Sequence, residues 1–124
     1  MLISGVADMT AEVKAKLFRG FADRSRLTVL ESLLAGPRCV SDLAKSTRLS
    51  QPNLSMHLAC LRDCGLVRPR RNGRFVYYEL ADLSVMRLLK AAEQVLRQVA
   101  KQIEACPRYG NKESSHGKRT LPKR

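Results

Sequence analysis

The sequence is poor in several residue types, and each shortage narrows the classes of protein that it encodes. It has no Trp, 5% aromatic residues, and 11 Asp and Glu against 23 Lys and Arg. No apolar run approaches the roughly 20 residues of a membrane-spanning helix. Residues 1–10 lack the basic start and the long apolar centre of a signal peptide. We therefore expect a cytoplasmic protein, whose four cysteines are thiols or metal ligands rather than disulfides.

Catalytic patterns are also missing. We find no pairing of a base with a nucleophile, no Gly-rich phosphate loop and no group of convergent carboxylates, so an enzyme is not expected. The net charge of +12 instead favours a polyanionic partner. Nucleic acid is the first candidate and a membrane surface is the alternative. Residues 108–124 supply +5 of this charge, so the rest of the chain still carries about +7.

Apolar periodicity and capping residues predict five helices in 124 residues, a length that suggests one domain. Thr10, Asp23, Ser41, Ser50 and Asp82 are the expected N-caps. The first helix runs to about residue 22, and Gly36-Pro37 stops the second. A short helix over 42–46 and a helix over 51–63 follow, and a long helix covers 83–105.

A β-hairpin is predicted between the fourth and fifth helices. Asn72-Gly73 is a strong two-residue turn signal between strands expected over 66–71 and 74–80. The apolar stripe of the 83–105 helix is too long for the small body to cover alone, which predicts pairing with a second copy. We thus expect a flexible lead-in over 1–9, a folded domain over 10–106 and a basic disordered tail over 107–124.

This order of elements predicts a mainly α fold of the winged helix-turn-helix type, with five helices, a two-stranded wing and dimerisation through the terminal helices. The helices at 42–46 and 51–63 have helix-turn-helix spacing, and the second would enter the major groove of DNA. Candidate base and phosphate contacts on that helix are Ser50, Gln51, Asn53, Ser55 and His57. Candidate phosphate or minor-groove contacts on the hairpin are Arg68, Arg70, Arg71 and Arg74.

Simpler interpretations exist for each of these groups taken alone. The polar residues at 50–53 would serve as helix caps, and His57 would be a surface residue. The four arginines would form a charged edge that prevents sheet aggregation. Taken together with the basic body and the hairpin that follows the helix pair, they favour binding of double-stranded DNA.

The chain resembles the ArsR/SmtB family of metal-responsive repressors over about residues 12–106. The matching strings are "ADRSRL", "VSDLA…LSQPNLSMHL", "GLV" before a basic hairpin, and the long last helix. The resemblance implies a homodimeric winged helix-turn-helix repressor. It also implies that the metal-free dimer binds operator DNA and that a metal ion releases it.

Family members differ in where they bind metal. The arsenite-type site begins Cys-Val-Cys, whereas this chain reads Cys39-Val40-Ser41, and the zinc-type site needs histidines that are absent from 83–105. The string "CLRDCGLV" is instead similar to the cadmium- and lead-sensing, CmtR-like subgroup. That resemblance implies Cys60, Cys64 and Cys106 as the ligands of Cd(II) or Pb(II).

The proposed ligands also make chemical sense from helix geometry. Residues at i and i+4 lie about 5–6 Å apart at Cβ, so one soft ion can bridge the thiolates of Cys60 and Cys64. Cys106 would add a third sulfur, from the same chain or from the second copy. Other soft metals or As(III), an inert cysteine pair and a thiol redox sensor stay open as alternatives. We interpret Cys39 as structural and assign no role to His116 in the tail.

Overall fold

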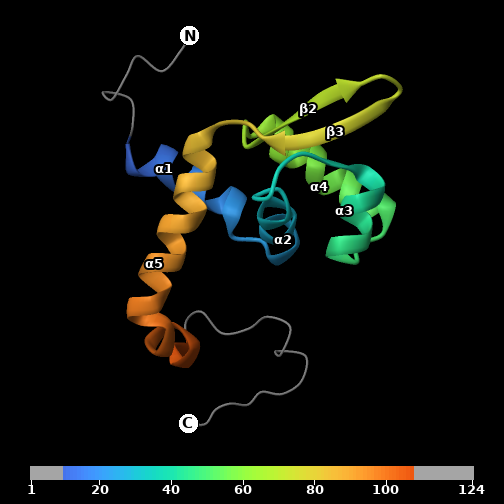
Figure 1. Ribbon diagram of the computed structural model, residues 1–124. Helices are drawn as coiled ribbons and strands as arrows, with labels where there is room; N and C mark the ends of the chain where they lie inside the picture. Colours follow the sequence, from blue (N-terminus) through green and yellow to red (C-terminus); the bar gives the residue numbers. More distant parts are fainter. Residues whose placement is uncertain (1–9, 108–124) are drawn as a thin grey trace. The chain divides into compact units, whose positions relative to one another are not determined.

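The computed structural model describes residues 10–107, which form five helices and a three-stranded sheet (Figure 1). The expected lead-in and nearly all of the expected tail lie outside these residues. The elements in chain order are α1 (Ala11–Phe21), α2 (Arg24–Ser32), β1 (Arg38–Cys39), α3 (Val40–Thr47), α4 (Gln51–Asp63), β2 (Val67–Asn72), β3 (Phe75–Leu80) and α5 (Leu83–Ala105).

The chain divides into two compact units within α5, one ending at Met86 and the other starting at Arg87. The first unit holds α1 to α4, the sheet and the first residues of α5. Its core forms where α2, α3, α4 and β2 meet, and α4 contributes leucines at the three- and four-residue spacing of one helix face. The buried apolar residues of this unit are Val29, Leu30, Leu33, Leu43, Leu54, Leu58, Leu61, Leu66, Val67 and Val85.

Three predicted N-caps are confirmed by hydrogen bonds from backbone N–H groups. Val13 donates to Thr10 Oγ1 at 3.3 Å, Arg26 to Asp23 Oδ2 at 2.9 Å, and Asn53 to Ser50 Oγ at 3.3 Å. Each bond satisfies one of the amide groups that the first turn of a helix leaves unpaired. The sequence therefore places the starts of α1, α2 and α4 correctly.

The side chain of Arg26 joins α2 to the end of α1. Its Nε donates to the Gly20 carbonyl at 3.1 Å, and its Nη2 donates to the Arg19 carbonyl at 3.1 Å. A cation at the C-terminus of a helix also interacts favourably with the helix dipole. The string "ADRSRL" therefore encodes both a cap for α2, through Asp23, and a clamp on α1, through Arg26.

The start of α3 differs from the prediction. The N-cap is Cys39, which makes no capping hydrogen bond through its side chain, and the helix begins at Val40 rather than after Ser41. The reason is tertiary, since Arg38 and Cys39 form the short strand β1, which pairs with Tyr78 and Tyr77 of β3. Because of this pairing, the N-cap of α3 is Cys39, two residues before the predicted N-cap Ser41.

The sheet has the antiparallel order β1-β3-β2, so β1 is an addition to the predicted two-stranded wing. The hairpin turn is also shifted by one residue. Asn72 pairs with Phe75, which leaves Gly73 and Arg74 as the two loop residues. Gly73 has a φ of 66° and Arg74 is not among the residues of positive φ, a combination typical of a turn with Gly at its first central position.

The last helix, α5, has the bounds predicted from its apolar stripe, Leu83–Ala105. Asp82 accepts a hydrogen bond from the Ser84 N–H at 2.9 Å, in agreement with its expected role at the helix start. Beyond its first turns the stripe is largely uncovered, because Val95 is 59% and Leu96 46% exposed. Among the residues that the structure describes, no helix is both long and apolar enough to cross a membrane.

Candidate nucleic-acid interface and thiol pair

The helix pair α3–α4 is joined by a tight turn of three residues, 48–50. Arg48 ends α3 in the left-handed conformation, with a φ of 64°, and its N–H donates to the Ala44 carbonyl at 2.9 Å. The Thr47 hydroxyl donates to the Leu43 carbonyl at 2.6 Å and accepts from the Leu49 N–H at 3.3 Å. These local bonds fix the angle at which the chain enters α4.

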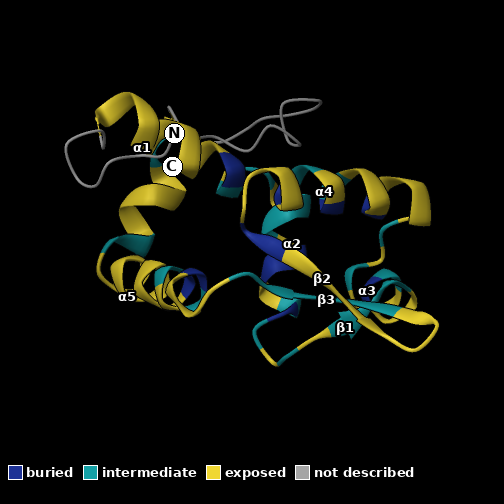
Figure 2. Ribbon diagram, turned by 90° about the horizontal axis from the view of Figure 1, so that it is seen from above, coloured by how far each residue is buried: buried dark blue, intermediate teal, exposed yellow. Residues whose placement is uncertain are grey.

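One face of α4 is buried and the opposite face is exposed (Figure 2). Leu54, Leu58 and Leu61 anchor the helix to the core, which leaves its other side free to meet a partner. Of the predicted contacts, Gln51, Asn53, Ser50 and Ser55 are exposed at its N-terminal end. His57 is half-buried beside the core stripe, so it reaches solvent less fully than the others.

The sequence analysis missed one residue of this exposed face. Met56 is 58% exposed, and the residues before and after it, Ser55 and His57, are polar. The signal in the sequence is its position, because it falls two residues after Leu54 and two before Leu58 and so points away from the core stripe. Single exposed apolar side chains are common on protein surfaces, and what distinguishes Met56 is its place on the exposed face of α4, the second helix of the helix-turn-helix.

The arginines of the wing are not equivalent. Arg68 Nε lies 2.7 Å from Glu79 Oε2, and Arg70 Nη1 lies 3.1 Å from Glu79 Oε1, so one carboxylate holds two guanidinium groups. Hydrogen bonds from Arg68 and then Arg70 hold the pKa of Glu79 below its ordinary value. Arg71 and Arg74 are exposed and make no ion pair within residues 10–107.

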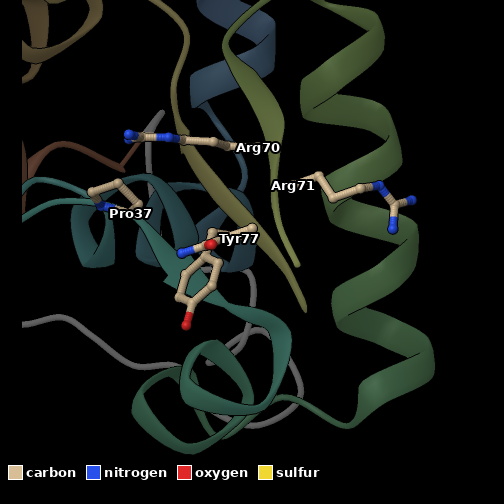
Figure 3. Close-up of a pocket in the computed structure, with 5 residues that line it drawn as sticks. Pro37, Arg70, Arg71 and Tyr77 are labelled. Carbon is tan, nitrogen blue, oxygen red and sulfur yellow. The ribbon is translucent and has the colours of Figure 1, made fainter. Parts of the chain in front are cut away.

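The strand places these arginines on two faces. Successive side chains of β2 alternate, so Arg70 and Arg71 leave the strand in opposite directions, and Figure 3 shows Arg71 extending on the side of α4. The hollow in that view is lined by Pro37, Arg70, Arg71, Asn72 and Tyr77. Arg68 and Arg70, which Glu79 holds, therefore share one face of β2, and Arg71 lies on the other.

The two cysteines of α4 lie next to each other. Cys60 is half-buried in the helix, and Cys64 is its exposed C-cap residue, whose N–H donates to the Cys60 carbonyl at 3.0 Å. The pKa of the Cys64 thiol is raised above its ordinary value, first by the protein atoms that exclude water from its sulfur and then by the charge and hydrogen bonding of Cys60. The positive charge of Arg26 opposes this rise.

The other cysteines lie apart from this pair in the chain. Cys39 is half-buried at the start of α3, with its Sγ 3.3 Å from the Ser41 hydroxyl. Cys106 is half-buried just after α5 and belongs to the second unit. Within residues 10–107 of one chain, no three His, Cys, Asp or Glu side chains are grouped closely enough to hold a metal ion.

A helix pair with a free polar face, followed by a basic antiparallel hairpin, defines a winged helix-turn-helix DNA-binding protein. The sequence matches the family described as "Bacterial regulatory protein, arsR family" over residues 23–68. It is 35% identical to a probable mercury resistance operon repressor of Streptomyces lividans over 78% of each chain. The chain therefore belongs to the ArsR/SmtB family of metal-responsive repressors, and it is a DNA-binding transcriptional repressor rather than an enzyme.

Two further relatives bear on the site. The regulator CmtR of Mycobacterium tuberculosis (strain H37Rv) is 40% identical over 72% of this chain and 75% of its own length. The homodimeric winged helix-turn-helix DNA-binding domain of Mb0332 from Mycobacterium bovis has a TM-score of 0.65 and 30% identity, and the match covers 82% of this chain and 96% of that one. Their similarity extends beyond the helix-turn-helix into most of the folded chain.

Proposed function

We propose that this repressor binds operator DNA as a metal-free homodimer and is released when Cd(II) or Pb(II) binds a thiolate site formed by Cys60, Cys64 and Cys106. The observation that carries the proposal is the pair of neighbouring thiols at the end of α4, the second helix of the helix-turn-helix. Because its target is DNA, the repressor acts in the cytoplasm. The ligand set is the one that the resemblance of "CLRDCGLV" to the CmtR-like subgroup implies, and CmtR of Mycobacterium tuberculosis is 40% identical over 72% of this chain.

The DNA contacts follow from the two exposed polar surfaces. We assign base-edge and phosphate contacts to the start of α4, where exposed side chains both donate and accept hydrogen bonds. We assign phosphate contacts to the wing, where guanidinium groups release counterions on binding. The assigned residues are Ser50, Gln51, Asn53, Ser55, His57, Arg68, Arg70, Arg71 and Arg74.

Dimerisation is supported by apolar side chains that the single chain leaves uncovered. On α1, Phe18 is 53% exposed and Leu17 40%, and on α5 Val95, Leu96 and Ile103 are between 41% and 59% exposed. Such residues on two helices near the chain ends are typical of a homodimer interface. Mb0332, the structural relative from M. bovis, is itself homodimeric.

The donor set fits a soft ion. Two thiolates one helical turn apart approach an ion with metal–sulfur bonds of about 2.3 Å or somewhat longer, and thiolates select soft or borderline ions. A third sulfur must come from outside α4, and Cys106 at the end of α5 is our candidate. Supply by the second copy in the dimer would link the dimer interface to the DNA-reading helix.

Release of DNA requires that the ion bind the DNA-incompetent arrangement better than the competent one. Tying Cys60 and Cys64 to the segment after α5 would fix α4 relative to the dimer interface. The two reading helices would then be misplaced relative to major grooves about 34 Å apart. A typical coupling of this kind lowers operator affinity by about 5–150-fold.

The test is a titration of operator binding with Cd(II), Pb(II), Zn(II) and As(III) at constant ionic strength, because phosphate contacts make the affinity strongly salt-dependent. We expect Cd(II) or Pb(II) to release DNA, with a thiolate-to-metal absorption band that disappears in Cys60→Ser, Cys64→Ser and Cys106→Ser. Cys39→Ser is the matched control and should respond like the wild type. Induction that survives all three substitutions would contradict the proposal.

A second candidate keeps the DNA binding and changes the signal to mercury, arsenite or thiol oxidation. The observation that favours it is the similarity to the probable mercury resistance operon repressor. Hg(II) is therefore added to the titration series, which already contains As(III), and peroxide is tested in parallel without metal. Release by peroxide but not by any metal would identify the thiol pair as an oxidation sensor.

A further inference from the structure

We propose that Met56 contacts the 5-methyl groups of thymines in the major groove and so sets part of the operator preference. The inference deepens the proposed DNA contacts of α4 and rests on them. It starts from the one large apolar side chain on the exposed face of that helix, which is 58% exposed and has no core to join.

Helix geometry places Met56 near the middle of the exposed face. At roughly 100° per residue, its side chain projects about 200° from Leu54, close to the direction opposite the buried stripe. The exposed residues nearest to it are Pro52 and Asn53 in the preceding turn and Ala59 in the next. A duplex that meets this face squarely therefore meets Met56.

The chemistry of the major groove leaves one partner for such a side chain. Base edges present hydrogen-bond donors and acceptors, and the thymine 5-methyl is the apolar group among them. The methionine side chain is flexible and polarisable, so it adapts to a methyl group without needing a fixed pocket. A polar residue at position 56 would gain nothing from that methyl.

A protein partner fits this face less well. The residues next to Met56 on the exposed side are small or polar, which gives no contiguous apolar patch for another protein. The apolar surfaces suited to a second copy are on α1 and α5 instead. The matching family region, residues 23–68, contains the whole of α4.

The experiment removes the methyl group from the DNA and the side chain from the protein. The full-length repressor first selects a high-affinity duplex from a random pool. Each thymine of that duplex is then replaced singly by deoxyuridine, which lacks only the 5-methyl group. Affinities at constant salt are compared for the wild type, Met56→Ala and Met56→Leu, with Phe75→Ala, a wing residue of equal exposure, as the matched control.

For the wild type and for Met56→Leu, we expect about fourfold weaker binding when a contacted thymine loses its methyl, the effect of removing roughly one buried methylene. Met56→Ala should be indifferent to the same replacement, and Phe75→Ala should remain sensitive. If no thymine shows this coupling, or if Phe75→Ala abolishes it equally, the proposal is wrong.

The variant Gln51→Ala distinguishes a failure of the Met56 proposal from a failure of all the DNA contacts proposed for α4. Gln51 is exposed at the first turn of α4 and offers both a donor and an acceptor. If Gln51→Ala relaxes the base preference while no thymine couples to Met56, only the methyl contact is refuted. If Gln51→Ala leaves base preference unchanged as well, α4 does not read the operator and both assignments fall.

Discussion

Glu79 should limit how strongly the wing binds DNA. Its carboxylate holds Arg68 at 2.7 Å and Arg70 at 3.1 Å, while both arginine side chains remain 62% exposed. These guanidinium groups therefore face solvent with part of their charge already neutralised. The substitution Glu79→Gln removes the negative charge and keeps the size of the side chain, so both arginines become available to phosphates.

The magnitude follows from counterion release. Each new phosphate contact steepens the slope of log K against log salt by about 0.9, so two arginines in each copy of a dimer steepen it by about 3.6. Between 50 and 200 mM salt, the affinity of Glu79→Gln for DNA should therefore fall by roughly 150-fold more than the affinity of the wild type. Binding at the lower salt concentration should be correspondingly tighter.

The assay is fluorescence anisotropy with a non-specific duplex across this salt range. The matched control is Glu31→Gln, which makes the same change of charge at an exposed position on α2 where no arginine of residues 10–107 pairs with the carboxylate. We expect the control to change the slope by less than about 1. Equal slopes for Glu79→Gln, Glu31→Gln and the wild type would refute the reasoning.

Three further predictions concern stability and assembly. Because the pKa of Glu79 is lowered on folding, its ion pairs stabilise the fold above pH 4.5 and are lost below it, so Glu79→Gln should flatten the acid limb of the unfolding curve. Arg48 has a φ of 64°, a left-handed conformation that is unfavourable for a residue with a Cβ atom, so Arg48→Gly should raise the free energy of unfolding by about 0.5–1 kcal/mol in urea titrations. A decrease in the free energy of unfolding would contradict this reasoning. Leu96→Glu should yield monomers in analytical ultracentrifugation, whereas Glu93→Gln, also exposed on α5, should leave the dimer intact.

Local chemistry determined most of the helix boundaries. Thr10, Asp23 and Ser50 cap their helices as predicted, because an N-cap needs only a side-chain oxygen and an amide three residues later. Gly65 ends α4 with a φ of 80°, a conformation that favours glycine. The 3.6-residue period of apolar side chains likewise gave the bounds of α5 and the buried stripe of α4.

Contacts between residues far apart in the sequence decided the start of α3, the number of strands and the position of the hairpin turn. Pairing of Arg38 and Cys39 with β3 moved the start of α3 and added a strand, and the register of the hairpin moved its turn from Asn72-Gly73 to Gly73-Arg74. The same register set Glu79 opposite Arg68, which divides the wing arginines into paired and free. The sequence by itself determined which segments become helices and which residue types line them, because those depend on near neighbours. Only the tertiary structure decided which charges meet, because that depends on how the elements pack and on the register of the strands.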